Sequence, residues 1–123
     1  MKQSEINKSY NALVRLSQVR LPIKTAFSVY QLVKKMEEPY KFALEEEKKL
    51  INKYNAEVKE NGIISFSSAE DKDSFQNELQ ELNQLDHDIE IEPIVIKIED
   101  LGEQTITPSD ILALEGFVEF EGD

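Results

Sequence analysis

The sequence predicts an α+β fold, with a long helix that is kinked at Pro39 and packs in a helical hairpin beside a small antiparallel sheet. Three patterns predict it. Apolar residues recur at steps of three and four for about 35 residues after Pro22, a shorter stripe of the same period follows residue 67, and isoleucines alternate with charged residues from 89 to 98. We expect a single domain over residues 1–123, with a helical part at about 4–84 and an acidic, β-rich part at about 86–121.

The first helix is expected at 4–18, where Ser4 can accept a hydrogen bond as its N-cap and apolar residues follow at helical spacing. Leu21 and Pro22 end this pattern, because the residue before a proline is pushed out of the α region.

The long helix is expected at 23–60 and would measure about 50 Å at 1.5 Å per residue. Pro39 lies within its apolar stripe and removes one backbone hydrogen bond. Because the apolar register continues past Pro39, the sequence predicts one kinked helix, ended by Asn61-Gly62.

The third helix is expected at 68–84, because Ser67-x-x-Glu70 has the spacing of a capping box. A short strand at 63–66 would precede it. Its narrow apolar face must lie against another apolar surface, and the long helix is the obvious partner for an antiparallel hairpin.

The acidic part is expected to supply most of the sheet. Residues 88–98 form a strand pattern whose alternation slips at Pro93, which predicts a bulge or an edge break there. Thr107 followed by Pro108 predicts a short helix at 109–114, and residues 117–120 are β-prone. The sheet would combine 88–98 with 63–66 or 117–120.

Charge is divided unevenly between the two halves of the chain. Residues 1–60 carry 12 basic and 8 acidic side chains, whereas residues 61–123 carry 2 basic and 17 acidic ones. The overall charge of −11 disfavours direct contact with nucleic acid or an anionic membrane. The five bases Arg15, Arg20, Lys24, Lys34 and Lys35 are interpreted as partners for the acidic half of this chain or of a second copy.

No combination of residues predicts a reaction. The chain has no cysteine and one histidine, His87, between Asp86 and Asp88. Neighbouring residues in a loop seldom converge on one ion, so this triplet is interpreted as a solvated turn. Its glycines are isolated and form no phosphate-binding loop. We expect no catalytic residue, no cofactor, no metal site and no enzymatic activity.

A resemblance adds to this interpretation. The order of segments runs from Asn52-Lys53-Tyr54-Asn55 through an acidic helix around Phe75 to the closing stretch from Thr107 to Phe120. In this order of segments the chain resembles a family of small uncharacterised proteins from phages and prophages of Gram-positive bacteria. The resemblance implies no reaction and no ligand residues. It favours a cytoplasmic protein of the host bacterial cell that serves a phage.

Two kinds of contact function follow. As an assembly or scaffold-type factor, the protein would use apolar anchors on the long helix, for which the candidates are Tyr30, Val33, Tyr40 and Leu44. As an acidic inhibitor that mimics nucleic acid, it would oppose a basic host protein with Glu90, Glu92, Glu99, Asp100, Glu119 and Glu121. The partner would be a phage protein, a host protein or a second copy. We also expect a homodimer, because helices 4–18 and 68–84 are too short to cover the whole stripe of the long helix.

Overall fold

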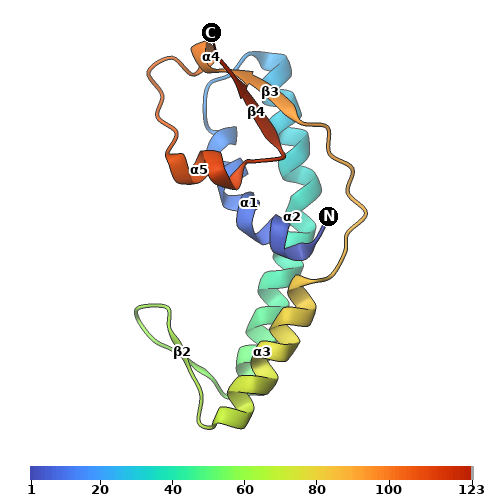
Figure 1. Ribbon diagram of the computed structural model, residues 1–123, viewed down its shortest axis with the longest axis vertical. Helices are drawn as coiled ribbons and strands as arrows, with labels where there is room; N and C mark the ends of the chain where they lie inside the picture. Colours follow the sequence, from blue (N-terminus) through green and yellow to red (C-terminus); the bar gives the residue numbers. More distant parts are fainter. Residues whose placement is uncertain (123) are drawn as a thin grey trace.

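The computed structural model describes residues 1–122 and confirms the α+β class, with 58% of the chain in helices. The long helix α2, Ile23–Lys53, forms the axis of an elongated molecule (Figure 1). The other elements pack along α2 in two groups: α1 and the C-terminal strands lie at one end, and α3 with a small β-hairpin lies at the other (Figure 1).

Helix α1, Gln3–Ser17, begins without the predicted cap. Its N-cap residue is Lys2, and Ser4 lies inside the first turn. The end is held instead by long-range backbone pairing, since the Gln3 amide donates to the carbonyl of Leu85 at 2.8 Å. A tertiary contact here replaces the local side-chain cap that the sequence suggested.

Helix α2 ends at Lys53, seven residues before the predicted end. Asn55 has a positive φ of 50°, a left-handed conformation that asparagine tolerates and that stops a helix. The chain then forms strands β1, Glu57–Val58, and β2, Ile64–Ser65, which pair antiparallel. Gly62, with a φ of 82°, lies in the turn between these strands, so the prediction that Asn61-Gly62 ends the helix was wrong.

Helix α3, Ala69–Asn83, packs against the C-terminal part of α2 and forms the predicted helical hairpin (Figure 1). Its N-cap is Ser68, whose hydroxyl accepts from the Asp71 amide at 3.1 Å. Phe75 is buried between the two helices, with the ring of Tyr54 edge-on at 6.4 Å. Lys53 at the end of α2 also pairs with Glu78 at 2.8 Å.

The second sheet joins strand β3, Ile94–Lys97, to strand β4, Val118–Glu121, and the two strands run parallel. Between them lie α4, Ile98–Leu101, which the sequence did not indicate, and α5, Pro108–Ala113. Thr107 caps α5 as predicted, accepting from the Asp110 amide at 3.1 Å. The predicted strand 88–98 is shortened to 94–97. Pro93 lies directly before β3 and forms no bulge within it. The change in alternation at Pro93 marks the point where the irregular segment 87–93 ends and the strand begins.

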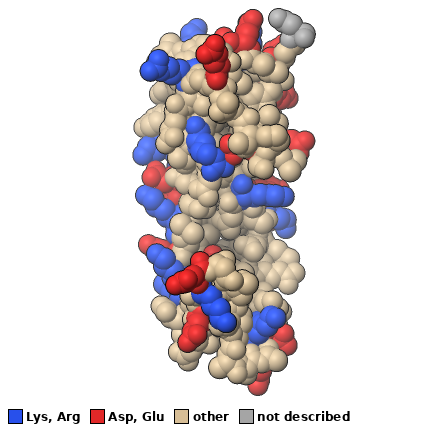
Figure 2. All heavy atoms as spheres, turned by 90° about the vertical axis from the view of Figure 1, so that its left-hand side faces the viewer, with Lys and Arg blue, Asp and Glu red and all other residues tan. Residues whose placement is uncertain are grey.

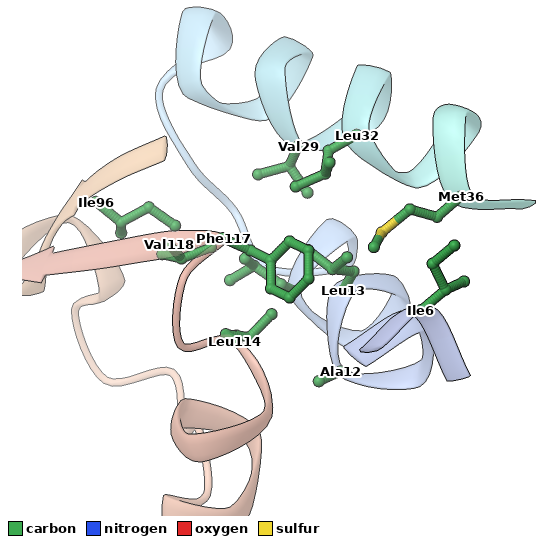
Figure 3. Packing of buried hydrophobic residues seen from close by; sticks show 11 residues of the cluster. Ile6, Ala12, Leu13, Val29, Leu32, Met36, Ile96, Leu114, Phe117 and Val118 are labelled. Atoms are coloured by element: carbon green, nitrogen blue, oxygen red, sulfur yellow. The ribbon is translucent and has the colours of Figure 1, made fainter. Parts of the chain in front are cut away.

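The main core forms where α1, α2 and the second sheet meet. Figure 3 shows Val29, Leu32 and Met36 of α2 pointing toward Leu13 of α1 and toward Phe117, which precedes β4. Ile96 of β3, Val118 of β4 and Leu114 after α5 close the far side. Inward residues of the sheet alternate with outward ones, as one covered face requires.

Helix α2 continues through Pro39 without a break. The Pro39 carbonyl accepts a further hydrogen bond from the side chain of Gln3 at 3.1 Å. One continuous helix is therefore confirmed, while a kink at this point stays a prediction.

Candidate interaction surfaces

The outer face of α2 leaves a group of apolar side chains in water. Ile23, Phe27 and Tyr30 lie at positions i, i+4 and i+7, so they share one face of the helix. Their exposed fractions are 83%, 56% and 53%, and the rings of Phe27 and Tyr30 stack with centroids 6.1 Å apart. We call these three residues the α2 patch.

The predicted anchors divide into two groups. Tyr30 and Leu44 are exposed. Val33 and Tyr40 instead pack against the core, and the Tyr40 ring stacks on that of Tyr10 at 4.2 Å. Both side chains are only partly buried, so their use as interface anchors stays a prediction, and their packing leaves less of them open to a partner than of Tyr30 and Leu44. The sequence interpretation missed Ile23 and Phe27, although their spacing with Tyr30 was a usable signal.

The predicted dimer stays a prediction, and the structure shows how far the two short helices cover α2. Helix α1 packs on one end of α2 and α3 on the other, so the two short helices follow one another along its length (Figure 1). Within the described residues, the α2 patch is the main apolar group that this arrangement leaves uncovered on the N-terminal half of α2.

All six residues of the predicted acidic surface are exposed, and none forms an ion pair with another of residues 1–122. They lie in two places. Glu99 and Asp100 on α4 and Glu119 and Glu121 on β4 belong to neighbouring elements, and Glu99 and Glu121 line one hollow with Lys97. Glu90 and Glu92 lie apart from them, beside α2.

A shallow groove of about 430 Å³ separates α2 from residues 90–95. Lys24 and Lys35 line its helix side, and Glu90 and Glu92 line the other side. Charges of both signs therefore face one another here, in agreement with the expectation that the basic stretch meets the acidic half. Figure 2 likewise shows basic and acidic side chains interspersed on one face of the molecule, without a continuous acidic row there.

One pair of this kind is direct. The Arg15 guanidinium on α1 donates to the Asp110 carboxylate on α5, with Nε at 3.0 Å. Hydrogen bonding to Arg15 lowers the pKa of Asp110 below its ordinary value, and the Thr107 hydroxyl and amide contribute in the same direction. This ion pair links α5 to α1.

His87 is not in a solvated turn. It is half-buried, and its Nε2 contacts the side-chain oxygen of Gln3, which is fully buried. Because an amide oxygen only accepts, Nε2 carries the hydrogen of this bond. The backbone of His87 pairs with Met1, its amide donating to the Met1 carbonyl at 2.7 Å. His87 therefore joins the start of α1 to the segment after α3.

Within residues 1–122, no three His, Asp or Glu side chains gather closely enough to hold a metal ion. Of the helices described, none is both long and apolar enough to span a bilayer. Comparison of the chain with protein-family models, with curated proteins and with solved structures finds no match in any of the three.

Proposed function

We propose that this protein is a non-enzymatic accessory protein of a phage or prophage that acts by protein–protein contact, as an assembly or scaffold-type factor in the host cytoplasm. The observation that supports this most is the α2 patch. Exposed apolar side chains that adjoin one another are uncommon on a protein that works alone, and they mark interaction sites. Aromatic side chains such as Phe27 and Tyr30 also supply much of the energy of protein interfaces.

Affinity capture from phage-infected cells tests this function. The tagged protein is expected to retain a phage structural or assembly protein, and retention is expected to survive high salt because apolar burial is insensitive to ionic screening. A capture that yields only host proteins, all released by salt, would contradict the assembly role.

The second candidate is an acidic inhibitor of a host nucleic-acid-binding or defence protein. It is supported by the exposure of the four acids on α4 and β4, which form no ion pair with the other residues described, 1–122. A mimic of nucleic acid would bind a basic host protein that salt releases steeply. Replacing Glu99, Asp100, Glu119 and Glu121 by their amides would abolish such binding, while the same variant should leave the capture of an assembly partner unchanged.

A further inference from the structure

We propose that the α2 patch is the docking surface for an acidic amphipathic helix of a partner protein. The inference rests on the proposed contact function and adds the chemistry of the partner and the place where it binds. It depends on two features of α2, the arrangement of its uncovered apolar side chains and the charge around them.

The apolar feature has the geometry that a helix can match. Ile23, Phe27 and Tyr30 extend over two turns, on the side of α2 opposite the buried Val29 and Met36. Two helices pack side by side through residues at such spacing. A partner helix with three apolar side chains over two turns would cover the α2 patch.

The stretch of chain that carries the patch is basic. From residue 6 to residue 36 the chain carries six basic residues and no acidic one. Arg15 is neutralised by Asp110, and Glu90 and Glu92 lie near Lys24 and Lys35 across the groove. Arg20 lies in the loop before α2, and Lys34 lies one turn after Tyr30 on the same face of the helix; both side chains are exposed. Two acids follow, Glu37 and Glu38, and Glu37 pairs with Lys34 at 3.4 Å and with Lys41 at 3.1 Å. Residues 20–41 still carry five basic side chains against these two acidic ones.

This charge favours an acidic partner over a second copy. In a two-fold dimer the patch would meet itself, which brings the Arg20 and Lys34 side chains of both copies into one interface. Like charges in such a contact oppose association, whereas Glu or Asp flanking the apolar face of a partner helix would favour it.

Three synthetic helical peptides test the proposal. They share one apolar face of three leucines and differ only at the flanking positions, which are all Glu, all Gln or all Lys. Binding is measured by fluorescence anisotropy, and the site is mapped by amide chemical-shift changes. The wild-type protein is compared with Phe27→Ser, with the double variant Arg20→Gln and Lys34→Gln, and with Phe42→Ser. Phe42 is the matched control, because it is 43% exposed on a different face of α2.

The Glu peptide is expected to bind most tightly and to shift the amides around residues 23–34. High salt should reduce its affinity to that of the Gln peptide without abolishing binding, because the apolar contact is not screened. Phe27→Ser should weaken it by about ten-fold or more, and the double charge variant by roughly two- to five-fold per charge. Phe42→Ser should leave it unchanged.

Several results would overturn the proposal: equal binding of the Glu and Lys peptides, shifts confined to another surface, or no binding of any peptide. So would a dimer in sedimentation that Phe27→Ser dissociates, or Phe27-dependent binding to phosphatidylcholine–phosphatidylglycerol vesicles, because each gives the patch a different occupant. The proposed function is judged separately. If Phe27→Ser still captures the phage partner, the function stands and this surface is rejected. If the Glu peptide binds but no phage partner is captured, the function is rejected.

Discussion

Replacing Gln3 by leucine should destabilise the fold, although the substitution changes no charge and alters the side-chain volume only slightly. Gln3 is fully buried at the start of α1, and its amide makes three contacts. Its nitrogen donates to the Asn7 side chain at 2.9 Å and to the Pro39 carbonyl at 3.1 Å, and its oxygen accepts from His87. The side chain therefore links α1, the middle of α2 and the segment after α3.

The expected loss follows from these three bonds. Each contributes about 0.5–1.5 kcal/mol to the free energy of unfolding, and the His87 N–H would be left without its partner in a half-buried place. The leucine side chain offsets part of the loss because it is itself apolar. We expect a net decrease of about 2 kcal/mol, which is roughly a thirty-fold change in the folding equilibrium.

Urea unfolding followed by circular dichroism at 222 nm gives this quantity for Gln3→Leu and two controls. Asn7→Ala removes one of the three Gln3 bonds together with a long hydrogen bond from Asn7 to Asn83 at 3.4 Å, and should cost about 1 kcal/mol. Gln76→Leu changes an exposed glutamine on α3 and should stay within about 0.5 kcal/mol of the wild type. A Gln3→Leu protein as stable as the Gln76→Leu control would refute the assignment of Gln3 as a structural link.

Three further predictions concern single features of the fold. Thr107→Ala should lower the unfolding free energy by about 1 kcal/mol, because the Asp110 amide loses its cap, whereas Thr105→Ala should have little effect. Because Arg15 holds the pKa of Asp110 below its ordinary value, the pair stabilises the fold at neutral pH and loses this effect as the pH falls below about 4. The stability gap between the wild type and Asp110→Asn should therefore narrow between pH 7 and pH 3, and a constant or widening gap would contradict this. Pro39→Ala restores a backbone donor to the middle of α2 and should stabilise the protein by up to about 3 kcal/mol in thermal unfolding, and a lower melting temperature would show that the proline is needed for packing.

Local signals were sufficient where one residue determines one backbone bond. Thr107 before Pro108 predicted the cap and start of α5, and the apolar period predicted that α2 passes through Pro39. The sequence indicated Ser67 as the cap of α3, and the structure uses the next residue, Ser68. Such errors are small, because neighbouring polar residues compete for the same amide.

Long-range pairing accounts for the larger differences. The sequence left 63–66 and 117–120 open as antiparallel partners of the strand at 88–98, whereas the structure pairs residues 94–97 with 118–121 in parallel. Nothing local in the sequence indicates the crossover through α4 and α5. The link between Gln3 and His87 joins residues 84 positions apart. A buried glutamine in the first turn of α1 that pairs with a distant histidine follows no sequence period, so this contact could be found only in the structure.

The choice between two apolar faces of α2 shows why the candidate site was only half predicted. Val29, Leu32 and Met36 form one stripe at helical spacing, and the α2 patch forms another on the opposite side. Periodicity alone assigns both to the inside, since each satisfies the same pattern. The decision is made by α1 and the β3–β4 sheet, which together cover one side of the N-terminal half of α2 and leave the other side to solvent. An apolar face that the chain's own elements leave uncovered is available to a partner, and for this reason we propose the α2 patch as the contact surface in preference to the partly buried Val33 and Tyr40.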